Sequence, residues 1–314
     1  MATVLTSTSA APWRPDLDVF AAADVVPTAL ILQTATIAGE IEGDAPSVRV
    51  AFVDDADAEF VAEGDEIPEA DPKLAEVTVY TGKISQLIRI SREQFVQRGT
   101  SPQLAASVGR AIVKRADAAY LNQPAPDAGQ VTPPAGILEH PGIITVATPI
   151  SDNLDALTEL VSILESAGGT PTAIVMNPLS WGQLRTLKVG EGRNDTLLGA
   201  GTTDSPRLLL GLPVLVNPNI TPGRGAVLNR TAIAAAAGPV QIAKSEHVYF
   251  RNDSVGLRAT WRIGWNLVHP DRIGAFTVST PGQLSAPPTK PPAEPTPTKA
   301  PRTTRTPETP PAAS

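Results

Sequence analysis

The segment from Asp54 to Asp71 constrains the fold of this chain most strongly, because it concentrates negative charge where no long helix can form. It contains nine acidic residues and no Lys or Arg. Gly64, Pro68 and the following Pro72 interrupt this part of the sequence, which excludes a long helix. The flanking residues 47–53 and 74–92 alternate and are rich in β-branched side chains, a pattern that predicts strands.

The simplest structure for this region is a long two-stranded hairpin with an acidic end. A two-stranded hairpin is only marginally stable by itself in water. Two alternatives follow: the hairpin packs on its own domain, or a neighbouring chain supports it.

A calcium loop is a second interpretation of the acidic segment. With Asp55 as the first position, acidic residues fall at five of the positions that supply ligands in an EF-hand. Phe60, however, occupies the sixth position, where the loop must turn sharply and Gly is required. The flanks also have the pattern of strands instead of helices. We therefore interpret the segment as an acidic loop, solvated or at an interface, and predict no metal site.

Charge is divided unevenly along the chain. Residues 40–76 contain 2 bases and 13 acids, whereas residues 77–280 contain 18 bases and 14 acids. One short segment therefore accounts for the net charge of −7, while the body of the chain is mildly basic. This asymmetry argues against a general nucleic-acid binder, which needs a basic face. It favours self-association, in which the acidic part of one copy meets the basic part of another.

Several functional classes lack support in the sequence. The chain has no Cys, which excludes disulfides and thiol chemistry, and only three His. We find no nucleophile-elbow, P-loop, zincin or dinucleotide-binding motif. No apolar stretch is long enough to cross a membrane, and the N-terminus does not have the pattern of a signal peptide. We predict no catalytic or cofactor-binding residue and no cofactor, although a calcium-dependent or hydrolytic α+β enzyme remains the alternative class.

The remaining pattern indicates an α+β fold. Residues 1–40 are typical of an extended arm with one short helix around Pro15–Ala23. Ser101 and Pro102 are good N-cap and N1 residues, and apolar residues at helical spacing then predict a helix to residue 122. A second amphipathic helix is predicted from near Asp152, and a short one after Asn177 as its cap. The segment 281–314 has eleven prolines, which predicts disorder with polyproline II character.

Trp261 and Trp265 have the even spacing of residues on one face of a strand. We interpret them as packing anchors. The alternative is a base-stacking platform, for which Arg258 and Arg262 would be the adjacent basic groups.

The succession of these elements resembles a known family. The blocks FVAEGDEIPEADPKLAEVTVYTGKISQLIRISREQF, PPAGIL, IVMNPLSWGQLRTLK, LLGLPVLVN and VGLRATWRIGWNLVHPDRIGAFTV occur in the order found in the Hong Kong 97 type major capsid proteins of tailed double-stranded DNA phages. No single block is specific. Their ordered succession over residues 25–280 carries the resemblance.

The resemblance implies an α+β capsid fold with six parts. These are an N-terminal arm (1–43), an E-loop hairpin (44–82), a P-domain with a long spine helix (83–139), an A-domain (140–230), return strands to the P-domain (231–280) and a disordered Pro-rich tail (281–314).

The implied function is that of a structural protein and not an enzyme. Such a protein self-assembles as hexamers and pentamers into an icosahedral shell around double-stranded DNA, which it encloses without sequence-specific binding. The implied location is the virion capsid, assembled in the host bacterial cytoplasm, with no membrane contact. An encapsulin-like nanocompartment shell is the alternative within this fold.

Two departures from the family pattern are informative. Only about 25 residues precede the region 25–280 that carries the resemblance, so scaffolding would be a separate protein or absent. The resemblance also implies a portal and a decoration protein as partners. Some members also crosslink an E-loop Lys to an Asn, with a Glu as base. Here the matching positions are Asp253 and Thr260, so we predict that Lys73 forms no crosslink.

The charge pattern and the resemblance together give a hypothesis for the subunit interface. The acidic hairpin end of one subunit contacts basic groups of its neighbour. The residues in this hypothesis are Glu63, Asp65, Glu66 and Asp71 on the acidic side, and Arg98, Arg110, Lys114 and Arg115 on the basic side.

Overall fold

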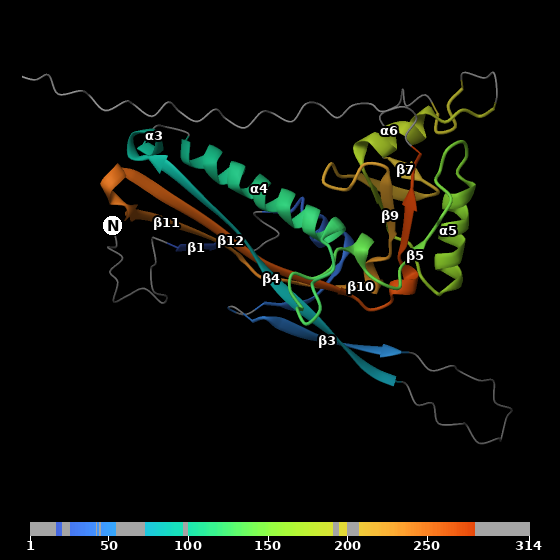
Figure 1. The fold of residues 1–314 in the computed structure, drawn as a ribbon, viewed down its shortest axis with the longest axis horizontal. Helices are drawn as coiled ribbons and strands as arrows, with labels where there is room; N and C mark the ends of the chain where they lie inside the picture. The colour runs from blue at the N-terminus through green and yellow to red at the C-terminus, as the bar shows by residue number, and fades with distance from the viewer. Residues whose placement is uncertain are drawn as a thin grey trace, which may run out of the picture. The chain divides into compact units, whose positions relative to one another are not determined.

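The computed structural model describes residues 17–20, 26–41, 43, 45–54, 73–96, 100–190, 195–199 and 207–279. All of them belong to one unit, Met1–Thr280. Within it the chain forms two β-sheets, and the longest described helix lies on the larger one (Figure 1).

The larger sheet has seven strands. They are β1 (Leu17–Phe20), β2 (Thr36–Glu40), β3 (Ser47–Asp54), β4 (Lys73–Ser91), β10 (Ile233–Ala237), β11 (Val240–Tyr249) and β12 (Ser254–Leu267). β12 lies at the centre, with β4 along one edge, while β11 and β10 share the other edge. The pairs in this sheet are antiparallel except for β2 with β10.

The predicted hairpin is confirmed. β3 pairs with the first part of β4 in a register that runs from Ser47 opposite Tyr80 to Asp54 opposite Lys73. β4 then continues without a break into the seven-stranded sheet, where it pairs with β12 as far as Ser91. Val79 of the hairpin is fully buried in a small cluster with Ile41 and the alanines of β10. The base of the hairpin therefore packs on its own subunit.

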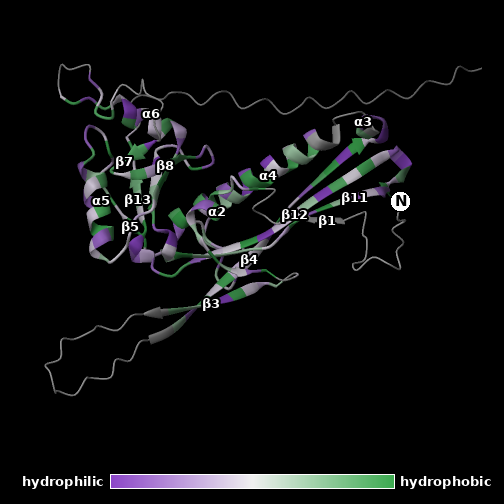
Figure 2. Cartoon of the chain, turned by 180° about the vertical axis from the view of Figure 1, so that it is seen from behind, coloured by the Kyte–Doolittle hydropathy of each residue, from purple (hydrophilic) through white to green (hydrophobic). Residues whose placement is uncertain are grey.

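The long helix predicted from Ser101 is also confirmed, as α4 (Thr100–Asn122), although Ser101 lies within its first turn and is not its N-cap. Its buried residues Val108, Ile112, Ala116 and Tyr120 follow the spacing of a single helix face. They pack against one face of the seven-stranded sheet in the main core of the molecule. Hydrophilic and hydrophobic residues alternate along β4 and β12, as expected for strands with only one face against this core (Figure 2).

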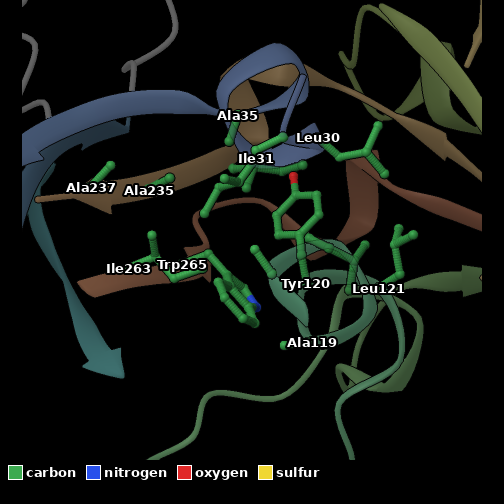
Figure 3. Close-up of a cluster of buried hydrophobic side chains, with 14 of the residues drawn as sticks. Leu30, Ile31, Ala35, Ala119, Tyr120, Leu121, Ala235, Ala237, Ile263 and Trp265 are labelled. Carbon is green, nitrogen blue, oxygen red and sulfur yellow. The ribbon is translucent and has the colours of Figure 1, made fainter. Parts of the chain in front are cut away.

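Both tryptophans of β12 point into this core. Trp261 is fully buried and Trp265 is 4% exposed. Trp265 meets Tyr120 edge to face, with ring centroids 5.5 Å apart, and its indole Nε1 donates to the carbonyl of Ala135 at 2.7 Å. Figure 3 shows the two rings between α4 and the strands, with Leu30 and Ile31 beside them. The interpretation as packing anchors is correct.

The short helix predicted around Pro15–Ala23 is wrong. Residues 17–20 of that range form β1, which hydrogen-bonds to β11 at the edge of the sheet. A short helix occurs later instead, as α2 (Leu30–Thr34). Leu30 and Ile31 are buried against α4, so packing rather than local capping determines where this five-residue helix forms.

The smaller sheet has six strands in the order β5-β13-β9-β6-β8-β7. Their bounds are β5 (Ile144–Thr145), β6 (Ala173–Met176), β7 (Leu208–Leu209), β8 (Leu212–Val216), β9 (Arg224–Leu228) and β13 (Gly274–Thr277). The predicted second helix is α5 (Asp155–Ser166), which buries Leu157, Leu160 and Leu164 in a separate core. It begins three residues after Asp152, where the side chain of Asn153 accepts from the N–H of Asp155.

The third predicted helix is confirmed as α6 (Pro178–Thr186), with the Oδ1 atom of Asn177 accepting from the N–H of Leu179 at 2.9 Å. The remaining elements are short. They are α3 (Arg92–Val96) and the 3-10 helices η2 (Ile137–Glu139), η3 (Arg230–Ala232), η4 (Phe250–Asn252) and η5 (Pro270–Arg272).

The segment 231–280 contributes to both sheets. β10, β11 and β12 lie in the larger sheet, whereas β13 pairs with β9 and β5 in the smaller one. The chain therefore crosses between the sheets after Leu267. The Pro-rich tail 281–314 lies outside the described residues.

Candidate assembly surfaces

Five of the eight predicted interface residues lie outside the described part of the chain. These are Glu63, Asp65, Glu66, Asp71 and Arg98. The candidate calcium loop that begins at Asp55 lies outside it as well. Arg110, Lys114 and Arg115 are described, and all three are exposed on α4. The structure therefore describes one side of the predicted contact only.

The bases of α4 border a groove of about 950 Å³. Its floor consists of small and apolar side chains, among them Ala105, Gly109 and Ile242. Arg110 and Lys114 line the groove together with Asp117. Arg115 is directed elsewhere and donates from Nη2 to the Oε1 atom of Gln123 at 3.1 Å.

Asp117 is a buried carboxylate that joins three parts of the fold. It is 2% exposed. Its Oδ1 atom accepts from the N–H of Leu30 at 2.9 Å, and its Oδ2 atom accepts from Nδ2 of Asn217 at 2.7 Å. Leu30 begins α2, and Asn217 follows β8 of the smaller sheet, so Asp117 connects both to α4. Burial raises the pKa of this carboxyl above its usual value, although the two hydrogen bonds oppose the shift.

A second polar residue of α4 reinforces the same connection. Asn122 donates from Nδ2 to the carbonyl of Asn219 at 2.7 Å, and its Oδ1 atom accepts from the hydroxyl of Thr221 at 3.1 Å. Sequence reasoning missed Asp117 and Asn122. The sequence did contain a signal for Asp117, because this acidic residue directly follows Ala116 on the apolar face of the predicted helix.

A second basic surface lies on the opposite side of the larger sheet. Side chains alternate along a strand, so the residues next to those that pack on α4 face away from it. On β4 these include Lys83 and Arg89, and on β12 they include Arg258. We call these three exposed residues the open-face bases. No helix of the described chain covers this face (Figure 1).

The strands that carry the open-face bases supply no acidic neighbour among their described residues: no described side chain that β4, β11 or β12 directs to this face is acidic. The guanidinium of Arg89 lies 5.1 Å from the ring centroid of Tyr249. Arg262 also faces this side and donates from Nη1 to Oγ1 of Thr81 at 2.9 Å.

The base-stacking alternative for the tryptophans is wrong. Trp261 and Trp265 face α4, whereas Arg258 and Arg262 occupy the opposite face of β12. Because consecutive residues of a strand alternate, aromatic and basic side chains at odd spacing cannot form one platform.

An ion-pair network lies where β11 and β12 meet α3. Arg92 donates to Asp253 at 2.9 Å and to Glu246 at 3.1 Å, and Lys244 lies 2.7 Å from Glu246. The hydrogen bond to Asp253 and the charge of Glu246 raise the pKa of Arg92. The hydrogen bond and charge of Lys244 lower the pKa of Glu246. Asp253, which the sequence resemblance predicts to correspond to the crosslinking position of the family, is thus paired with Arg92.

The described residues also bear on other functional classes. No helix among them is long and apolar enough to cross a membrane. No cluster of His, Asp and Glu within them has the arrangement of a metal site. Thr260, which the sequence resemblance predicts to correspond to the Glu of crosslinking members, is 8% exposed in the middle of β12.

Comparison with known proteins decides the family. The model of the phage capsid family matches residues 24–278. The chain belongs to the phage capsid family. This confirms the resemblance to the Hong Kong 97 type major capsid proteins that the order of sequence blocks predicted.

Solved structures show the same fold at low sequence identity. A structure from Gordonia phage Cozz is 17% identical, with a TM-score of 0.61 over 87% of this chain and 90% of that chain. The capsid of an empty GTA particle is 18% identical, with a TM-score of 0.61 over 81% and 90% of the two chains. A structure from Mycobacterium phage Adephagia is 14% identical, with a TM-score of 0.60 over 90% and 96%. A search of curated proteins gives no match.

The chain is therefore a major capsid protein. It is a structural subunit of the virion shell and assembles with other copies of itself. The nanocompartment alternative is not favoured, since the matches are to phages and to GTA particles.

Proposed function

We propose that this capsid protein assembles as hexamers and pentamers into an icosahedral shell that encloses double-stranded DNA without reading its sequence. The described hairpin β3–β4 takes the place of the E-loop (44–82), and α4 that of the spine helix in the P-domain (83–139). The A-domain (140–230), the arm (1–43), the return strands (231–280) and the tail (281–314) complete the proposed division.

The observation that carries this proposal is the separation of charge within one subunit. Residues 54–71 hold nine acids and no base. The described body of the chain presents bases on α4 and on the open sheet face. A subunit with acidic and basic surfaces that are separated in this way favours contact between the acidic surface of one copy and the basic surface of another. The acidic end of one subunit therefore meets a basic surface of the next, for which the α4 residues Arg110, Lys114 and Arg115 and the nearby Arg98 are the sequence-based candidates.

The proposal extends to partners and setting. A separate scaffolding protein, a portal and a decoration protein cooperate with the shell, which forms in the cytoplasm of the host bacterium. The subunit needs no catalytic activity for this role.

Electron microscopy of the expressed full chain, alone and together with the scaffolding protein, tests the proposal. We expect closed shells with five-fold vertices. A protein that stays a small oligomer under both conditions would contradict it. Reversal of Glu63, Asp65 and Glu66 to Lys should leave the subunit folded and abolish the shells, and normal shells from this variant would exclude the proposed acidic contact.

A further inference from the structure

We infer that the solvent face of α4 is a contact surface for the phosphate backbone of the packaged double-stranded DNA. The inference rests on the proposed function, in which the shell encloses DNA without reading its sequence, and it names the side chains that touch this polyanion. They are Arg110, Lys114 and Arg115, which the sequence alone offered as partners for the acidic segment of a neighbouring copy.

The exposed side chains of α4 carry positive charge only. Arg110, Lys114 and Arg115 are exposed, and no exposed side chain among the described residues of α4 is acidic. The three bases fall within five residue steps, which is about 8 Å along the helix axis. Asp117 is the one acid of this helix, but it is 2% exposed and both of its carboxylate oxygens accept hydrogen bonds. The helix therefore presents a dense positive charge to solvent.

The surface beside these bases is hollowed and has small side chains on its floor. The groove of about 950 Å³ is lined by Ala105 and Gly109. A second hollow of about 490 Å³ is lined by Arg115. Pro218 and Asn219 line both hollows, so the two adjoin along the helix. A bulky polymer can therefore approach this side of α4 closely and meet bases in both hollows.

The length of this surface suits a short stretch of duplex DNA. From Ala105 to Asn122, α4 runs for about 26 Å. One strand of B-form DNA carries a phosphate every 3.4 Å or so along the axis, and therefore about eight phosphates over this length. Three bases that can choose among eight phosphates need no fixed register. Contacts to phosphate also carry no sequence information, as the enclosure of a whole genome requires.

The density of charge distinguishes DNA from the acidic segment as the partner of α4. A DNA duplex carries one negative charge per 1.7 Å or so of its axis. The acidic segment has nine acids in eighteen residues, which is one acid per about 7 Å when the chain is extended. Over the part of α4 that holds the three bases, DNA therefore presents about five charges on its two strands and the segment about one. The α4 bases consequently gain more from DNA.

Neutralising substitutions test the inference on the full chain, at concentrations below those at which shells form. The α4 variant carries Arg110→Gln, Lys114→Gln and Arg115→Gln. The matched control removes the same charge from the open-face bases and carries Lys83→Gln, Arg89→Gln and Arg258→Gln. Single variants with Arg110→Gln or Lys114→Gln are measured beside them. Circular dichroism and thermal unfolding establish that each variant is folded.

Binding of a fluorescent DNA duplex of random sequence is then measured by anisotropy over a range of salt concentrations. The slope of log affinity against log salt should be shallower by about 2.7 in the α4 variant and by about 0.9 in each single variant, because each base neutralises one phosphate. The open-face variant should keep the slope of the wild type. In a parallel titration, a synthetic peptide with the sequence of residues 54–72 replaces the duplex. The α4 variant should bind this peptide as the wild type does.

Three results would overturn the inference. They are an α4 variant with the salt slope of the wild type, an equal loss of slope in the open-face variant, and an α4 variant that loses the peptide but keeps the duplex. The last result would assign α4 to the acidic segment instead. The DNA titration requires no shells, whereas failure of the wild-type chain to form shells with its scaffolding protein would contradict the proposed function itself. The two failures are therefore distinguishable.

Discussion

Asp117 shows how much a single residue can determine in this subunit. Its two oxygens accept one hydrogen bond from the start of α2 and one from the end of β8. An apolar residue at this position would leave two buried donors without an acceptor. Unsatisfied buried donors cost more than the net value of the bonds that they lose.

We therefore expect Asp117→Ala to lower the free energy of unfolding by about 2 kcal/mol at pH 7. Asp127→Ala, which changes an exposed acid in the loop after α4, serves as the control and should have little effect. Denaturant unfolding monitored by circular dichroism measures both. Equal stability of the two variants would show that the Asp117 hydrogen bonds contribute nothing net.

The pH dependence of this residue has a definite sign. Burial raises the pKa of Asp117 in the folded state, so the folded protein binds the proton more readily than the unfolded chain does. The resulting stability is fully present below the unfolded pKa and is lost as the pH rises through the folded pKa. The difference in unfolding free energy between wild type and Asp117→Ala should therefore be larger at pH 4 than at pH 8. A difference that is constant or reversed would contradict the raised pKa.

At the scale of elements, the contact between α4 and β12 depends on Trp265. Its ring is buried against Tyr120, and its indole N–H has the carbonyl of Ala135 as acceptor. We expect Trp265→Ala to cost about 3–5 kcal/mol of unfolding free energy, as large-to-small changes in a core do. Trp265→Phe keeps most of the packing and should cost about 1 kcal/mol for the lost hydrogen bond. Thermal and denaturant unfolding compare the two, and similar losses would place the energy in the hydrogen bond.

The hairpin permits a different element-scale test. Asp54 lies directly opposite Lys73, so an Asn-Gly turn can join the two strands in place of residues 55–72. Shortening the connection from eighteen residues to two lowers the entropy cost of closing it, by about 2 kcal/mol. We expect a subunit that is folded and at least as stable, but that forms no shells. Normal shells from this variant, seen by electron microscopy, would contradict any role of the acidic segment in assembly.

Sequence reasoning succeeded for elements whose pattern is local. The strands of the hairpin, α4 with its Pro-containing first turn, and α6 with its Asn177 cap all follow from spacing and capping within one segment. It failed for β1, which pairs with β11, and for α2, whose residues Leu30 and Thr34 bond to α4 residues 87 and 86 positions away in the sequence. For the same reason the role of Asp117 was not predicted, since its partners Leu30 and Asn217 are 87 and 100 residues away in the sequence. The role of the open-face bases depends on which face of a sheet they occupy.

At the scale of the whole molecule, the assembled shell should contain no covalent links between subunits. On the correspondence predicted from the sequence, Asp253 and Thr260 stand where crosslinking relatives have Asn and Glu, so this pair of residues supplies neither the amide partner nor the carboxylate base. Denaturing electrophoresis of purified particles should give a single band at the subunit mass. A ladder of multimers that survives boiling would contradict this prediction.

Assembly should also weaken as salt concentration rises, because exposed charges more than about 8 Å apart are screened at physiological ionic strength. Sedimentation of the full chain at 0.05 M and at 0.5 M salt measures its self-association and tests this expectation. Association that is insensitive to salt would indicate an apolar interface instead.

The continuity of β4 has a mechanical consequence for such a shell. This one strand forms half of the hairpin and then pairs with β12 from Gly264 to Ser254. A force that pulls on the hairpin end acts along the strand, so it loads these eleven residue pairs in shear and all together. Shear spreads the load over the whole ladder, whereas peeling would break its bonds one after another. In the proposed shell, pressure from the genome that stretches the contact of the hairpin end with a neighbour would therefore be carried into the centre of the larger sheet.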